Sequence, residues 1–190
     1  MNLKTIIAGA ILAGTITSAQ ATDYVIDDKG AHASINFSIK HLGYSWLVGR
    51  FNEFNGSFSY DEADPAASTV SVNIKPASVD SNHAERDKHL RSDEFLAVDK
   101  FPDAQFVSTA FTPAADGSAI LSGNLTLRGV TKPIEIAVTK IGEGKDPWGG
   151  YRAGFQGTTE LKLKEYGINF NLGPASESVY LNLNVEGIRQ

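Results

Sequence analysis

The sequence predicts an all-β protein with one or two short helices, built as an antiparallel meander of about eight strands. Three observations support this fold class. Apolar and polar residues alternate with period two through most of the chain after residue 22, as they do in strands with one buried face. Turn-forming residues separate the alternating segments. The alternation stops between His83 and Leu96, where seven of the twelve residues from His83 to Glu94 are charged.

Eight segments of the chain carry the alternation. In the first of them, Ile35, Phe37 and Ile39 share one face and the intervening residues are polar. Pro133 stands at the start of a later one, where a missing backbone N–H is tolerated. The eight segments are 35–39, 54–60, 70–74, 104–108, 121–127, 134–138, 161–163 and 179–185.

Short connections join most of these segments, so consecutive strands are expected to run antiparallel with one apolar face. Strands of ten or more residues favour a barrel over a sandwich. The interior of a barrel of about eight strands is either filled by side chains or holds one small ligand. Gly56 and Gly123 at inward positions fit both alternatives, because glycine leaves room and also permits close packing.

The charged segment is expected to form one or two short helices. Asn82 followed by Glu85 resembles a capping box, and Ser92 before two acidic residues resembles a second helix start. Asp87 and Arg91 have the i,i+4 spacing of a helical ion pair. Apolar residues are sparse, and the expected anchors onto the strands are Leu90, Phe95 and Leu96.

A metal- or acid/base-dependent enzyme centred on His83, Glu85 and His89 is the alternative interpretation of this segment. The two histidines are six residues apart, which places them about 120° apart around a helix. Two ligands on one helix usually have the i,i+4 spacing of a His-Glu-x-x-His motif. The chain has no cysteine and no Gly-x-Ser-x-Gly motif. We therefore expect a solvated helix rather than an enzyme, with no catalytic residue, metal or cofactor.

Two aromatic segments are predicted to be turns at the ends of the barrel. Trp46 and Arg50 belong to the first, and Trp148 and Arg152 to the second. Such side chains either line the mouth of an apolar cavity and meet a polar head group, or simply cap the barrel.

Residues 1–21 have the pattern of a secretory signal peptide: Lys4, an apolar run, and Ala19-Gln20-Ala21 at the cleavage point. The run is too short for a transmembrane anchor, and no later segment qualifies. Residues 22–190 then form one domain with a formal charge of −6. This mildly acidic balance argues against nucleic acid as a partner.

Several motifs, spread in order along the whole of this domain, resemble the YceI-like family of bacterial secreted proteins. The matching segments include His41-Leu42-Gly43-Tyr44-Ser45-Trp46, Arg86-Asp87-Lys88-His89-Leu90-Arg91-Ser92, Leu125-Thr126-Leu127-Arg128-Gly129-Val130-Thr131-Lys132-Pro133 and Asp146-Pro147-Trp148-Gly149. Within this family, the sequence of residues 82–92 most resembles that of periplasmic members.

This resemblance implies an extended lipocalin-like eight-stranded barrel in the periplasm, often a homodimer, with a tunnel for a polyisoprenoid or an isoprenoid quinone tail. It implies no catalytic set. We expect Trp46, Arg50, Trp148 and Arg152 to be the head-group candidates. The residues expected to line the tunnel are Ile35, Phe37, Phe58, Val72, Phe106, Leu125, Ile136 and Leu183.

Overall fold

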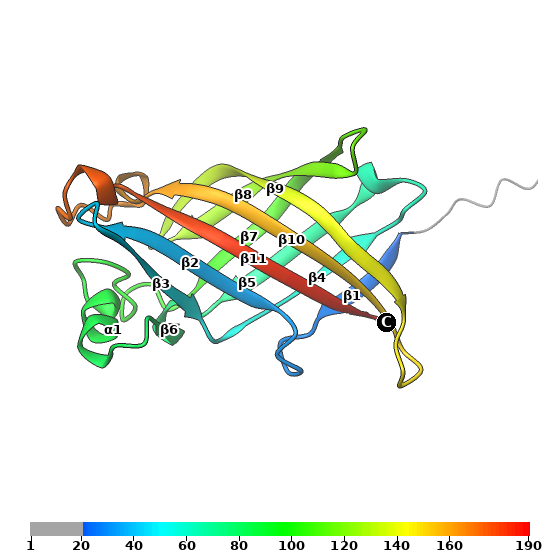
Figure 1. Cartoon of the computed structure of the whole chain (residues 1–190), viewed down its shortest axis with the longest axis horizontal. Coiled ribbons are helices and arrows are strands. Elements are labelled where there is room, and N and C mark those ends of the chain that lie inside the picture. The colour runs from blue at the N-terminus through cyan, green and yellow to red at the C-terminus, as the bar shows by residue number, and fades with distance from the viewer. Residues whose placement is uncertain (1–20) are drawn as a thin grey trace, which may run out of the picture.

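The computed structural model describes residues 21–190, and its strands form a single antiparallel sheet that curls into a barrel (Figure 1). The proposed signal peptide, except for Ala21, lies outside the described residues. The strands are β1 (Thr22–Ile26), β2 (Ser34–His41), β3 (Ser45–Phe51), β4 (Phe54–Tyr60), β5 (Thr69–Ile74), β6 (Val79–Asp80), β7 (Ala104–Pro113), β8 (Ser118–Leu127), β9 (Val130–Lys145), β10 (Tyr151–Lys162) and β11 (Ser178–Arg189).

Eight strands close the barrel, in the order β1-β4-β5-β7-β8-β9-β10-β11, because β1 pairs with β4 on one side and with β11 on the other. The predicted fold class is therefore confirmed. The set of strands in the ring differs from the predicted set by one strand. β1 closes the ring and was not predicted, whereas the predicted strand at residues 35–39 belongs to β2, outside the ring. Tyr24 and Ile26 of β1 are almost fully buried, so the period-two signal was present but too short to stand out.

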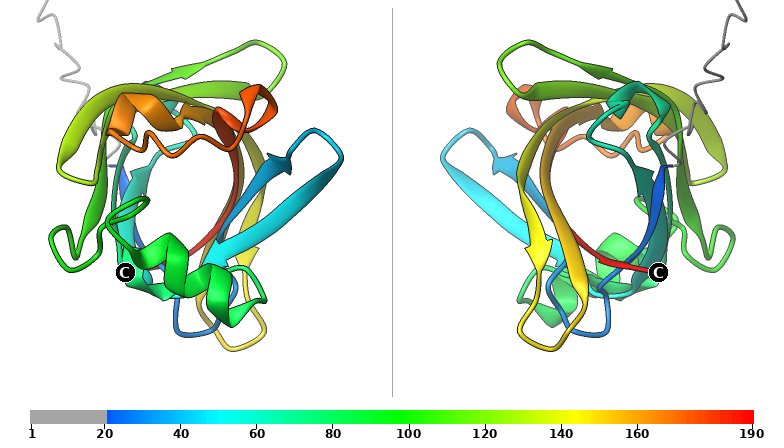
Figure 2. Two further views of the ribbon diagram at one scale, coloured as in Figure 1. Left: turned by 90° about the vertical axis from the view of Figure 1, so that its left-hand side faces the viewer. Right: turned by 90° about the vertical axis from the view of Figure 1, so that its right-hand side faces the viewer.

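The edge of β11 is shared between two strands. Its last residues pair with β1, whereas residues 179–184 pair with residues 34–39 of β2. β2 continues into β3, and β3 pairs with the two-residue strand β6. Where β11 begins, the barrel wall therefore continues into the β2–β3 hairpin. This hairpin splays away from the ring of strands, as the left-hand view of Figure 2 shows.

One α-helix, α1 (Ala84–Arg91), lies across that end of the barrel (Figure 2). Its N-cap is His83, whose Nδ1 accepts a hydrogen bond from the Arg86 backbone N–H at 3.2 Å. The predicted Asn82 cap is wrong, because Asn82 has a left-handed φ of 61° and its own N–H donates to Asp80. Turns follow Ser92 instead of a second α-helix.

The segment from His83 to Leu96 is anchored partly as predicted. Phe95 and Leu96 are buried, and Leu90 packs against the same apolar cluster as Leu96. The predicted Asp87–Arg91 pair does not form. Asp87 is buried and accepts hydrogen bonds from the backbone and hydroxyl of Ser81, while the Arg91 guanidinium donates to two backbone carbonyls before α1.

Four short 3-10 helices complete the described secondary structure, and the orange segment that contains η3 and η4 lies at the same end of the barrel as α1 (Figure 2). They are η1 (Pro65–Ala67), η2 (Pro76–Ser78), η3 (Leu163–Tyr166) and η4 (Pro174–Ser176). The segment containing η3 and η4 joins β10 to β11. No helix among the described residues is long and apolar enough to cross a membrane.

Candidate ligand-binding cavity

Two adjoining cavities occupy the inside of the barrel. The wider one, at the α1 end, has a volume of about 520 Å³, and the narrower one has about 150 Å³. Four apolar residues line both cavities, and we call this set the neck: Ile35, Ile74, Leu125 and Leu181. The two spaces therefore form one apolar path along the interior.

The wide cavity opens to solvent beside α1. Most of its lining is aliphatic or aromatic and buried or half-buried, from the inner faces of the strands together with Leu90 and Phe95. Its exposed lining residues come from three segments: the end of β2 with its turn, helix α1, and the connection after η3. They are Lys40, His41, Leu42, His89 and Phe170.

The narrow cavity is lined almost entirely by buried or half-buried residues. Asn184 is the single exposed residue among those that line it. Its polar side chains, such as Ser34 and Gln156, carry no charge. A chain that enters at α1 and passes the neck would therefore end in an uncharged, almost wholly apolar space.

The structure places all eight of the predicted tunnel residues on these cavities. Phe37 lines the wide cavity, and Ile35 and Leu125 belong to the neck. The other five line the narrow cavity: Phe58, Val72, Phe106, Ile136 and Leu183.

The space above the inward-facing glycines is filled by neighbouring side chains, so these glycines do not widen the interior of the barrel. A Cβ on Gly123 would collide with the ring of Phe106, which occupies that space. The ring of Phe58 fills the corresponding space over Gly187 and stacks on Tyr24 with ring centroids 4.8 Å apart. Gly157 likewise leaves only 2.9 Å between an added Cβ and Ile136 Cγ2. The cavity therefore comes from the barrel's diameter, and the glycines let large side chains pack against its wall.

The polar groups of the wide cavity all lie at its α1 end, and none of them is among the head-group candidates predicted from the sequence. Arg86 donates from Nε to the Ser81 hydroxyl at 2.7 Å, and Ser176 donates to the Lys40 carbonyl. The ring of His89 contacts the Glu94 carboxylate and packs edge-on against Phe170, with centroids 5.3 Å apart. The signal available in the sequence was the charged segment itself, since Arg86 and His89 both belong to it.

The four head-group candidates predicted from the sequence do not line either cavity. Trp46 lies on β3, not in a turn, and its ring packs edge-on against Tyr180. Arg50 pairs with Asp80 at 3.8 Å. Trp148 and Arg152 belong to the opposite end of the barrel, at the β9–β10 turn (Figure 1). Trp46 and Trp148 therefore lie at opposite ends of the barrel, and neither side chain lines a cavity.

Arg152 holds together the closed end of the barrel. Its Nη1 donates to Asp27 at 2.7 Å and to Glu186 at 2.5 Å, and its Nε donates to Asp146 at 2.9 Å. These three carboxylates raise the pKa of Arg152. Hydrogen bonds from His32 and then Arg152 lower the pKa of Asp27 to about 2.

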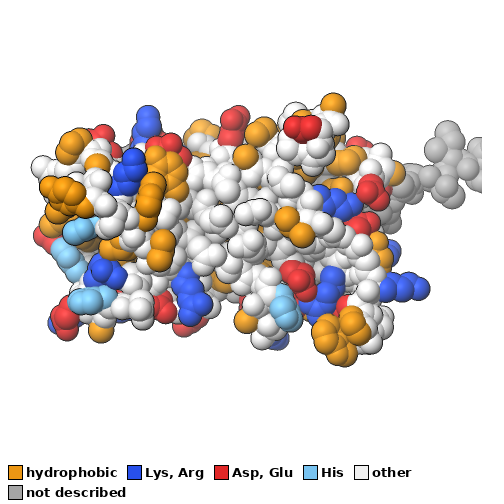
Figure 3. Space-filling model, in the orientation of Figure 1, with side chains coloured by type: hydrophobic (Ala, Val, Ile, Leu, Met, Phe, Trp, Pro, Cys, Tyr) orange, Lys and Arg blue, Asp and Glu red, His pale blue; other side chains and the backbone are white. Residues whose placement is uncertain are grey.

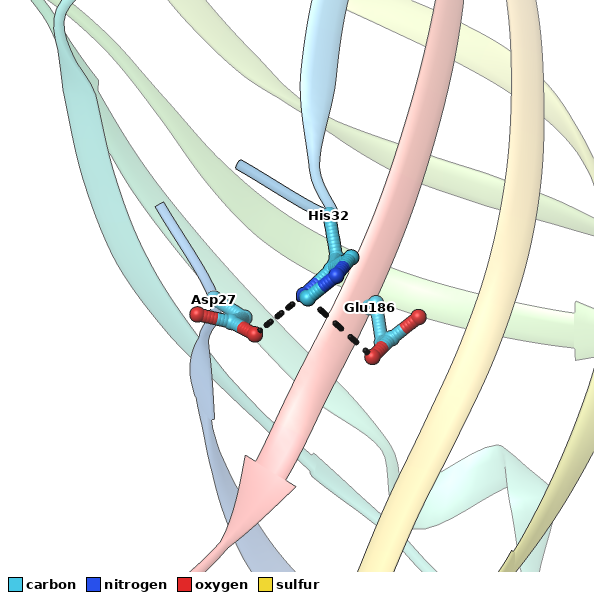
Figure 4. Close-up of side chains that lie close together, drawn as sticks. All are labelled: Asp27, His32 and Glu186. Atoms are coloured by element: carbon cyan, nitrogen blue, oxygen red, sulfur yellow. Dashed lines mark hydrogen bonds and ion pairs between the residues drawn. The ribbon is translucent and has the colours of Figure 1, made fainter. Parts of the chain in front are cut away.

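Asp27, His32 and Glu186 are near enough to one another to suggest a metal site (Figure 4). His32 Nδ1 lies 2.8 Å from Asp27 and 4.0 Å from Glu186. The Arg152 guanidinium already donates to both carboxylates, so it supplies the positive charge that a cation would bring. This cluster fits a structural ion network better than a metal centre.

The residues of the alternative enzyme interpretation are not brought together as a site. His83 caps α1, Glu85 is exposed on the first turn, and His89 is engaged by Glu94.

These features define a class: a closed antiparallel β-barrel whose apolar interior opens at one end, as in barrels that hold one small ligand. The YceI-like domain matches residues 24–187, and the chain belongs to this family. A UPF0312 protein of Ectopseudomonas mendocina (strain ymp) is 57% identical over 190 residues, which covers 99% of this chain and all of the relative.

Two solved structures share the fold. BcnA of Burkholderia cenocepacia superposes with a TM-score of 0.75 at 20% identity, over 85% of this chain and 98% of that one. A polyisoprenoid binding domain from Saccharophagus degradans superposes with a TM-score of 0.63 at 16% identity, over 90% of this chain and 100% of that one.

Proposed function

We propose that this protein is a periplasmic, non-enzymatic carrier that holds the tail of a polyisoprenoid lipid or isoprenoid quinone inside its barrel. The observation that carries the proposal is the apolar path from the opening beside α1, through the neck, to the narrow cavity. The polyisoprenoid-binding name of one structural neighbour points in the same direction.

The energetics favour a long apolar tail. Each CH₂ group removed from water contributes about 0.8 kcal/mol, so a chain of several isoprene units gains enough to offset the entropy lost on confinement. The lining of the narrow cavity carries no charged side chain. A charged head group would therefore find no partner there, whereas an apolar tail needs none. The tail is therefore proposed to lie inward, past Leu125 and toward Phe106.

The head group is proposed to stay at the α1 end, beside His41, Arg86 and His89. These side chains bring ring nitrogens and a guanidinium to a boundary between apolar lining and water. They suit a head with hydrogen-bond acceptors, which a quinone carbonyl and a phosphate both offer.

Export to the periplasm is part of the proposal, and its support is the signal-peptide pattern of residues 1–21. An apolar tail cannot cross water unaided, so a carrier is most useful in an aqueous compartment beside membranes. Sequencing the N-terminus of protein from a periplasmic fraction tests this element. The expected first residue is Thr22.

The proposed cargo is tested by purifying the protein without detergent, extracting it with organic solvent and identifying the extracted lipid by mass spectrometry. The expected result is an isoprenoid lipid in near-stoichiometric amount. Absence of any isoprenoid or other long-chain lipid, together with no uptake of added polyprenol, would overturn the proposal.

A further inference from the structure

The opening of the wide cavity is surrounded by exposed apolar side chains. We call this set the rim: Leu42, Tyr44, Trp46 and Phe170. Tyr44, at the tip of the β2–β3 hairpin, is 88% exposed, and Leu42 and Trp46 are each more than half exposed. In Figure 3, hydrophobic side chains gather at the left-hand end of the molecule, near the histidines.

The rim is continuous with the cavity. Leu42 and Phe170 are exposed on the outside and also line the wide cavity. The apolar surface therefore runs without interruption from the outer hairpin into the barrel. At the other end, Trp148 is exposed but lines neither cavity, and its ring lies 5.6 Å from the Arg152 guanidinium.

The chemistry of the rim suits the boundary of a bilayer. Trp and Tyr side chains have an apolar body and a polar edge, and they favour the level of the lipid head groups. Lys40 Nζ lies 5.5 Å from the centre of the Trp46 ring, and a lysine in that place can extend its amine to the water side. Acidic residues such as Glu94 and Glu177 flank the same end, so electrostatic attraction to an anionic surface is not the driving force.

We propose that the rim docks on the surface of a phospholipid bilayer, so that a lipid tail passes between the bilayer and the cavity without crossing water. This inference rests on the proposed carrier function. An isoprenoid tail would pass the apolar side chains of Leu42 and Phe170 on the route from the acyl region to the neck, with the polar groups of the opening beside it.

The two tryptophans of the chain allow a direct test, because one lies in the rim and the other at the opposite end. The variant Trp148→Phe retains Trp46 as the only tryptophan, and Trp46→Phe retains Trp148. Each is mixed with phosphatidylcholine vesicles whose acyl chains carry bromine, which quenches tryptophan fluorescence at short range. Unbrominated vesicles of the same composition give the reference.

The expected result is strong quenching and a blue shift of Trp46, with Trp148 unaffected. Equal quenching of both residues, or quenching of neither, would overturn the docking proposal. A dimer formed through the rim would also overturn it: Trp46 would be unquenched, and light scattering would show twice the monomer mass. Recovery of a bound isoprenoid by extraction is a separate result, so docking can fail while carriage stands.

A second pair of variants keeps the test independent of fluorescence. Tyr44→Ser removes an exposed aromatic side chain from the rim, and Trp148→Ser removes one from the other end. Flotation with phosphatidylcholine vesicles should fall about tenfold for Tyr44→Ser and stay at the wild-type level for Trp148→Ser. Equal flotation of the two variants would contradict the assignment of the surface.

Discussion

The two ends of this barrel differ in how they are closed. At one end, β1 pairs with both of its neighbours, and Arg152 ties together carboxylates from the β1–β2 loop, the β9–β10 turn and β11. At the other end, the ring of strands is extended by the β2–β3 hairpin and covered by α1. The first end is sealed by ladders and charges, whereas the second leaves a space of about 520 Å³.

Because the two ends differ in this way, residues that stabilise the fold and residues that would contact a ligand are expected to lie at different places along the barrel axis. The ion network around Arg152 lies at the end opposite the wide cavity, whereas the buried hydrogen bonds of Asp87 lie at the α1 end. Exposed apolar residues and the sparse polar lining lie where a ligand would enter. We therefore expect substitutions at the sealed end to change unfolding, and substitutions along the cavity path to change binding.

The largest effect is expected from Arg152→Met. Three carboxylates would remain close together without their cation, and Asp27 and Asp146 are almost inaccessible to solvent. Loss of their shared partner should lower the free energy of unfolding by clearly more than the loss of an exposed ion pair does, with ligand affinity unchanged. Urea denaturation and lipid titration measure the two quantities.

Lys164→Met is the matched control at the open end. Lys164 and Glu177 are 3.4 Å apart and both largely exposed, so the loss should be less than about 0.5 kcal/mol. Equal destabilisation by Arg152→Met and Lys164→Met would show that the ion network at Arg152 contributes no more to stability than an exposed ion pair at the other end.

The next effect concerns the neck. In Ile35→Trp, the indole would occupy the passage between the cavities. Affinity for a polyprenol should fall at least about tenfold, while stability changes by less than about 1 kcal/mol because the added atoms enter empty space. Ile141→Trp, on the exposed outer face of β9, should change neither quantity. Loss of stability without loss of affinity would indicate a filled core at Ile35.

Acid should weaken the sealed end through Asp27. The folded-state pKa of about 2 lies below the ordinary aspartate pKa of 3.8, so the ionised carboxylate stabilises the fold above about pH 4. That contribution is lost as the pH falls through about 2. Unfolding measured between pH 5 and pH 2 should therefore show a shallower slope for Asp27→Asn than for Asp28→Asn, its exposed neighbour. Identical slopes for the two variants would show that ionisation of Asp27 does not stabilise the fold.

A small and local effect is expected from His83→Ala, which removes the side-chain cap of α1. Loss of an N-cap costs about 0.5–1 kcal/mol, and here it should act locally. Amide hydrogen exchange should accelerate in α1 and remain unchanged in the β8–β9 ladder. Acceleration throughout the barrel would show that the cover and the ring unfold together.

The strand pattern was predictable because the alternation of residues such as Ile35 and Phe37 follows directly from one-sided burial. It also predicted which side chains face inward, from Phe58 to Leu183. β1 was missed because five residues give little periodicity. β3 was missed because Trp46 and Val48 are apolar on its outer face, where the pattern expects polar residues.

Long-range geometry was not predictable from the sequence. Nothing in the local sequence shows that Asp27, Asp146 and Glu186 converge on Arg152, since the pairings span as many as 125 positions. For the same reason the sequence did not show that Trp46 and Trp148 lie at opposite ends of the barrel.

The central claim is that an isoprenoid tail threads through the neck from the wide cavity into the narrow one. Affinity measured for polyprenols of increasing chain length tests it most directly, in the wild type and in Ile35→Trp. The account predicts that wild-type affinity rises with each added isoprene unit and then levels off, and that Ile35→Trp levels off at a shorter chain. The same dependence on chain length in both proteins would contradict it.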